Sequence, residues 1–108
     1  MKLLTKSDLK ALQRQDPHNP IGPGRELPAT ETMVLVKFFT PDSSWTWFAV
    51  SASQDPDTLD VQFFGLVQGL ERELGYFWLS ELERVRGPLG LSVERDLYFD
   101  PVPLSTLI

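Results

Sequence analysis

The run from residue 33 to residue 79 constrains the fold more than any other part of the chain. Four of its segments are rich in β-branched and aromatic residues, which suit the pleated surface of a sheet: 33–40, 45–51, 59–67 and 75–79. Proline, aspartate and serine after the first segment are typical of a turn, and a charged connection over 68–74 precedes the fourth. The sequence therefore predicts a four-strand antiparallel meander.

Alternation along these segments assigns side chains to two faces, because successive residues of a strand point in opposite directions. In the third segment one set is wholly apolar and is predicted to face the core: Leu59, Val61, Phe63 and Val67. In the second segment Trp45 and Trp47 share a face with Ala49, and neither face is cleanly polar. Two arrangements stay open: both faces are partly covered, or one carries an exposed aromatic patch of the kind that marks binding sites.

A short helix is predicted before the sheet, over residues 4–15. Thr5 is its expected N-cap, and Asp8 stands three residues later, in the position of a capping-box partner. Pro17 ends this helix because the residue before a proline avoids the α region. A helix of this length is not stable alone, so we expect it to pack on the sheet.

A second short helix is predicted after the sheet, within residues 79–88. Ser80 is expected to cap it, and Glu83 to complete the capping box. Gly87 is the residue expected just beyond its C-terminus. Leu82 would then face the sheet.

Residues 89–100 are predicted to close the domain as an edge strand or a turn. Its charged triplet, residues 94–96, is expected to form ion pairs. Three apolar residues of the segment are predicted to be buried: Val93, Leu97 and Phe99. The prolines at 101 and 103 are expected to end the regular structure.

These elements together predict a single α+β domain over residues 1–108. Its core would be an antiparallel meander sheet of four or five strands, with two short helices packed on one face. A long loop rich in proline and glycine (16–32) and a short tail (101–108) complete the predicted domain.

The composition limits where and how the chain works. The sequence has no cysteine, which excludes disulfides, thiolate metal sites and cysteine nucleophiles and fits a reducing compartment. No apolar run approaches the ~20 residues that span a membrane, and the first residues are too polar for a signal peptide. We therefore expect a cytoplasmic protein that does not bind membranes and is a monomer or a weak homodimer.

The net charge of −5 is concentrated in the second half of the chain. Residues 1–54 contain six Lys or Arg and five Asp or Glu. Residues 55–108 contain four Lys or Arg and ten Asp or Glu. An acidic half disfavours binding to a phosphate backbone, which depends on Lys and Arg. The charge is instead compatible with a protein partner that has a basic surface.

The sequence contains no motif that predicts catalysis. Its only histidine, His18, lies in the proline-rich loop, and no glycine-rich phosphate loop with its lysine is present. Glu71 and Glu73 are two residues apart, but acid–base catalysis by two carboxylates also needs a cleft and shifted pKa values. We therefore expect no metal, no cofactor and no enzymatic activity, and a carboxylate-based enzyme is the last of our alternatives.

The residues that we expect to contact a partner are acidic or aromatic: Asp42, Trp45, Trp47, Glu71, Glu73, Tyr76, Glu94 and Asp96. A non-enzymatic protein-binding module is the leading hypothesis. The first alternative is a single-stranded nucleic-acid binder in which Trp45, Trp47 and Tyr76 stack on bases. Lys37 is the only basic residue in the four predicted strands, which weakens that alternative.

A string of short stretches carries a family likeness: 37–41, 45–47, 63–67, 73–77, 79–83, 86–90 and 94–99. They resemble a small bacterial family of unknown function, DUF2958, over nearly the whole chain. The resemblance implies a protein of plasmids and other mobile elements, and it brings no catalytic residues. It also implies a role such as inhibition of a host defence system of the CRISPR or restriction type.

Overall fold

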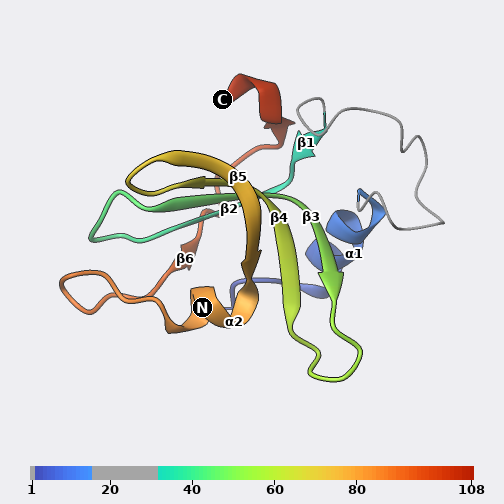
Figure 1. The fold of residues 1–108 in the computed structure, drawn as a ribbon, viewed down its shortest axis with the longest axis horizontal. Helices are drawn as coiled ribbons and strands as arrows, with labels where there is room; N and C mark the ends of the chain where they lie inside the picture. Colours follow the sequence, from blue (N-terminus) through green and yellow to red (C-terminus); the bar gives the residue numbers. More distant parts are fainter. Residues whose placement is uncertain (1, 16–31) are drawn as a thin grey trace.

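A five-stranded antiparallel sheet forms the centre of the structure, a computed structural model that describes residues 2–15 and 32–108 (Figure 1). The strands lie in the order β5-β4-β3-β2-β6. Their bounds are β2 Val36–Phe39, β3 Thr46–Gln54, β4 Val61–Gln68, β5 Arg72–Trp78 and β6 Glu94–Arg95. From β2 to β5, each strand pairs antiparallel with the next one along the chain. The predicted meander and α+β class are therefore confirmed, with β6 as the fifth strand.

The sheet has a row of small residues that crosses three strands. Ala49 of β3 is paired with Gly65 of β4, and Gly65 is paired with Gly75 of β5. The register of β3 shifts between Ala49 and Ser51, as at a β-bulge, which increases the local twist. A Cβ atom on Gly65 would overlap the carbonyl oxygen of Phe48, so glycine permits the close approach of β3 and β4. Figure 1 shows the pronounced curve of β5 beside these strands.

The first helix, α1 (Lys6–Arg14), begins as the sequence predicts. The N–H of Asp8 donates to the hydroxyl of Thr5, and the N–H of Thr5 donates to the carboxylate of Asp8. This reciprocal pair satisfies two main-chain donors that the first turn of a helix leaves free. The capping box is thus confirmed.

One face of the sheet is covered by a cluster of buried side chains that we call the helix-side core. α1 supplies Leu12, and the second helix, α2 (Leu79–Arg84), supplies Leu82. The strands supply Val36, Phe38, Trp47, Ala49, Ala52, Val61, Phe63 and Phe77. The burial of Val61 and Phe63 confirms the core face predicted for the third segment.

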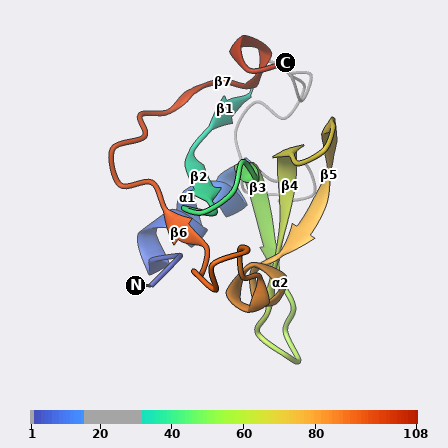
Figure 2. The same ribbon diagram turned by 90° about the vertical axis from the view of Figure 1, so that its left-hand side faces the viewer.

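The opposite face is covered by the C-terminal segment, which the sequence predicts to be irregular. Strand β7 (Val102–Pro103) pairs with β1 (Met33–Val34), and the short 3-10 helix η2 (Leu104–Thr106) follows. Figure 2 shows these three elements side by side. Leu104 is fully buried in what we call the tail-side core, together with Val34, Phe48, Val50 and Leu66. The tail-side core therefore covers the central strands of this face but not β5. The predicted end of regular structure before the tail is wrong, because a two-residue strand has no periodicity to read.

Helix α2 differs from its prediction at both ends. Ser80 lies inside the helix and does not cap it; its N–H and its hydroxyl donate to the carboxylate of Asp60, at 3.1 and 2.5 Å. Glu81, rather than Glu83, accepts the main-chain N–H that precedes the helix, at 3.1 Å. The helix ends at residue 84, and Gly87 belongs to a separate turn. A partner distant in the sequence has replaced the local cap.

Other predictions fail where a turn has a different extent. β5 begins at Arg72, so the predicted charged connection shrinks to the three residues between β4 and β5. Leu59 is exposed because it lies in a turn with a φ of 62°, and Leu97 is exposed in the turn after β6.

Residues 16–31 of the predicted loop, with His18, lie outside the described residues. Within the described ranges, no helix is long and apolar enough to cross a membrane.

Candidate functional site

The eight residues predicted to contact a partner lie in three places. Trp45, Glu71, Glu73 and Tyr76 belong to or adjoin the β4–β5 hairpin. Trp47 lies in the helix-side core. The remaining three lie along the β2–β6 edge of the sheet or the turn beside it: Asp42, Glu94 and Asp96.

The outer part of the sheet, at β4 and β5, exposes an apolar and aromatic surface. Phe64 is paired with Tyr76, and Leu66 with Leu74, so these four side chains share one face. Leu66 is buried in the tail-side core, whereas Tyr76 is 68% exposed and Leu74 is 44% exposed. The rings of Phe64 and Tyr76 are 5.2 Å apart and inclined at 60°. The tail-side core therefore ends before β5 and leaves Phe64, Leu74 and Tyr76 at the margin of the sheet.

β5 is also a free edge of the sheet. It is seven residues long and pairs with β4 alone among the described strands. The other edge strand, β6, is only two residues long. Long exposed edges present unpaired main-chain groups to other chains, and natural proteins usually shorten or cover them. We define the β5 surface as this edge with Phe64, Leu74 and Tyr76 and the exposed acidic residues Glu71 and Glu73.

The two predicted tryptophans differ in what they can offer a partner. Trp45 is 40% exposed, and its ring lies against Gly69 in the β4–β5 turn, where a Cβ atom would meet the ring. Trp47 is only 6% exposed, and its ring centroid is 6.0 Å from that of Trp45. Trp45 therefore lies beside the β5 surface, while Trp47 is a core residue with little surface to present.

Two of the three acidic residues at the β2–β6 edge, Asp42 and Asp96, have partners within the chain. The carboxylate of Asp42 accepts the N–H of Leu89 at 2.8 Å and that of Leu91 at 3.4 Å, which holds the 86–92 turn against the turn between β2 and β3. Asp96 lies 3.4 Å from the ammonium of Lys37. These contacts give both carboxylates structural roles.

The fold lowers the pKa values of three aspartates, Asp8, Asp55 and Asp60, and the first and last of these link separate elements. Partial burial raises the pKa of Asp8, but hydrogen bonds from Arg95 and Thr5 outweigh it and keep the pKa below its usual value. Desolvation likewise raises the pKa of Asp60, and hydrogen bonds from Ser80 and Val61 lower it by more. Asp8 joins α1 to β6, and Asp60 joins β4 to α2. Both carboxylates are therefore fixed in their charged form as structural links.

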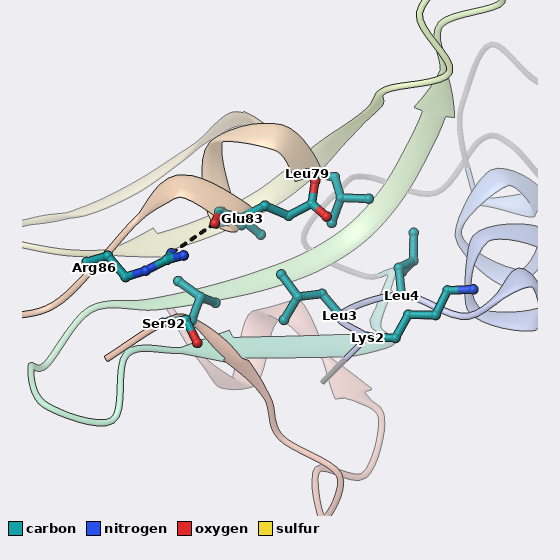
Figure 3. A pocket seen from close by; sticks show the side chains of 9 residues that line it. Lys2, Leu3, Leu4, Leu79, Glu83, Arg86 and Ser92 are labelled. Atoms are coloured by element: carbon teal, nitrogen blue, oxygen red, sulfur yellow. Dashed lines mark hydrogen bonds between the residues drawn. The ribbon is translucent and has the colours of Figure 1, made fainter. Parts of the chain in front are cut away.

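A pocket of about 320 Å³ lies away from the β5 surface, between the N-terminal segment, α2 and the irregular segment that leads to β6 (Figure 3). Its apolar lining consists of Leu3, Leu4, Leu79, Leu82 and Val93, and its polar lining of Lys2, Glu83, Arg86 and Ser92. Sequence reasoning missed this pocket because its walls come from three segments that no local pattern links.

In the part of the chain that the structure describes, no three His, Asp or Glu residues are placed to hold a metal ion.

The chain belongs to the family described as "Protein of unknown function (DUF2958)", whose model matches residues 3–108. The resemblance seen in the sequence is thereby confirmed. Comparison with curated proteins and with solved structures gave no match. The family description carries no activity.

Proposed function

We propose that this chain is a non-enzymatic protein-binding module and that the β5 surface is its binding site. One observation carries the proposal: the longest free edge of the described sheet coincides with an exposed aromatic side chain and an exposed apolar one. Tyr76 and Leu74 lie on that edge, and Phe64 lies beside them on β4. Exposed apolar groups of this kind are characteristic of interaction sites, and tyrosine is among the residues that contribute most to binding energy.

The chemistry of the surface indicates the kind of partner. Glu71 and Glu73 stand at the hairpin end of β5 and are exposed. The nearby Arg72 donates from Nη1 to the carbonyl oxygen of Leu107, at 2.8 Å, so part of its guanidinium already contacts the C-terminal segment. A partner with an apolar patch flanked by Lys or Arg would complement this arrangement. The family resemblance suggests a component of a host defence system as the first class of partner to examine.

Single-stranded nucleic acid fits the same surface less well. Base stacking on Tyr76 and Phe64 would need a neighbouring groove of positive charge. Glu71 and Glu73 stand on either side of Arg72 at the hairpin end of β5, so this end carries a net negative charge that would repel phosphate groups. The protein partner is therefore the better match to both the aromatic and the charged parts of the surface.

The test begins with affinity capture from a host lysate, with and without nuclease. A captured protein that survives nuclease treatment is purified, and its affinity is measured for the wild type and for variants. The variant Tyr76→Ala should weaken binding about tenfold or more, as at other aromatic hot spots. The matched control is Tyr98→Ala, because Tyr98 is another exposed tyrosine but lies beyond β6.

The acidic contribution is tested separately with Glu71→Lys and Glu73→Lys together. Their control is Asp57→Lys, an equally exposed charge change in the turn between β3 and β4. We expect the pair to weaken binding and the control to leave it unchanged. Capture that depends on nucleic acid, or a partner whose affinity is the same for the Tyr76 and Tyr98 variants, would overturn the proposal.

A further inference from the structure

We propose that the pocket beside α2 binds a small amphipathic anion, with its acidic group at Arg86 and Ser92 and its hydrocarbon chain among the leucines. This inference is independent of the β5 surface, and it concerns a site for a small molecule. It rests on three features of the pocket: five apolar residues in its lining, a fixed cation without an ion pair among the described residues, and a hydroxyl on the same side as that cation.

The interior of the pocket is suited to a short hydrocarbon chain. Leu4, Leu82 and Val93 are buried and form its apolar lining together with Leu3 and Leu79. A volume of about 320 Å³ falls at the lower end of the range for small-molecule sites, which is about 300–1,000 Å³. Such a volume accommodates a chain of about six to eight carbons with its head group at the opening.

Arg86 supplies a positive charge that the protein holds in place. Its Nη1 donates to the carbonyl oxygens of Glu83 and Val85, at 2.9 and 2.8 Å. These bonds fix the guanidinium, but a carbonyl oxygen does not neutralise it. The ion pairs of the described residues join Lys37 to Asp96 and Asp8 to Arg95, so none of them involves Arg86. Its remaining N–H groups can donate to a carboxylate or a phosphate.

Ser92 places a hydroxyl on the same side as that cation. Arg86 and Ser92 form an isolated antiparallel bridge, and residues directly opposite each other in such a pair project to the same face. In Figure 3, Arg86 and Ser92 lie at one end of the pocket and Lys2 at the other, with Leu3 between them. An anion bound at the Arg86 end would therefore extend its chain along the leucines toward Lys2.

The lining also contains Glu83, which argues for a single acidic group of modest charge. The charged residues of the lining are Glu83, Arg86 and Lys2. The lining as a whole thus carries one net positive charge. A monoanionic carboxylate matches that charge, and an alkyl phosphate carries the same chemistry with more oxygen acceptors. The two head groups are distinguished by the experiment.

The experiment is a titration of the full chain, labelled with nitrogen-15, with octanoate and with hexyl phosphate, followed by amide chemical shifts. Octanoate should bind with a Kd on the order of 1 to 10 mM, as expected for a ligand with so few heavy atoms. We expect saturable shifts confined to the N-terminal segment, α2 and residues 85–93. Butyrate should bind more weakly because it fills less of the pocket, and octanol should bind more weakly because it has no charge.

Variants separate the proposed site from general binding to apolar surface. Arg86→Gln should weaken octanoate binding about tenfold, since it removes a charge-assisted hydrogen bond. Arg86→Lys should retain more of the affinity, and Arg14→Gln on the exposed face of α1 should leave it unchanged. The head group that binds more tightly identifies the ligand class. The absence of saturable shifts with both anions, or equal affinity for octanol and octanoate, would refute the proposal, as would an unchanged affinity in folded Arg86→Gln.

Discussion

The substitution Gly65→Ala tests the close approach of β3 and β4. A Cβ atom at position 65 would overlap the carbonyl oxygen of Phe48, and it would lie 2.9 Å from the carbonyl carbon of Phe48 and 3.1 Å from Cα of Ala49. All three are main-chain atoms of a paired strand, so the strands themselves must move apart. Overpacking costs about 1–3 kcal/mol and occasionally more. We expect about 3 kcal/mol here, because no side chain can turn away to relieve the contact.

Gly75→Ala is the matched control in the same row of small residues. No atom lies within 4 Å of a Cβ atom built on Gly75, and its φ is not positive. Alanine should therefore increase the free energy of unfolding by about 0.4–1 kcal/mol, because it reduces the conformational entropy of the unfolded chain.

Urea unfolding, followed by tryptophan fluorescence and far-ultraviolet circular dichroism, measures both effects. For a domain of this size, 3 kcal/mol corresponds to a loss of about 12 °C in Tm. The reasoning fails if Gly65→Ala stays within about 1 kcal/mol of the wild type, which would mean that the strands separate at little cost. It also fails if the two alanine variants change stability equally.

Three further predictions concern contacts outside this row. Leu104→Ala should lower the free energy of unfolding by about 3 kcal/mol, because Leu104 is fully buried. Leu97→Ala, at an exposed position, should change the free energy of unfolding by less than about 0.5 kcal/mol. Urea unfolding of the two variants measures the difference. Asp60→Ala should cost about 1 kcal/mol, as loss of a helix cap does, and the amide protons of the first turn of α2 should exchange faster. The lowered pKa of Asp8 adds stability that is complete above its unfolded value of 3.8 and is lost as the pH falls through its lower folded value. The stability difference between wild type and Asp8→Asn should therefore shrink below pH 3.8, and a constant difference would contradict this.

The parts of the fold that the sequence predicts correctly are those with local causes. The capping box of α1 depends on two residues three positions apart, Thr5 and Asp8, and it forms as predicted. The four strands of the meander follow from β-branched and aromatic segments separated by turn residues, and their order is observed. In each case the signal and the contact lie within one segment or between neighbouring segments.

The parts that the sequence did not predict depend on contacts between distant segments. Asp60 replaces Ser80 as the cap of α2 because the start of β4 lies beside the helix, which no spacing reveals. Leu104 is buried because β7 pairs with β1, which lies about seventy residues earlier in the chain. The same applies to the candidate sites: alternation separated the side chains of β4 into faces, but only tertiary packing determines that Leu66 is covered while Tyr76 is exposed.

Gly75 links the architecture of the sheet to the proposed function. Glycine within a strand costs about 0.5–1 kcal/mol relative to alanine, and at this position the structure itself offers no contact that requires it. Gly75 lies at the centre of β5, the free edge that carries Tyr76 and Leu74. Glycine within a strand often marks a place where another backbone or a ligand approaches closely. If the β5 surface receives a partner in this way, Gly75→Ala should both raise Tm and weaken partner binding. If Gly75 instead serves only the packing of the sheet, the same variant should lower Tm and leave partner binding unchanged.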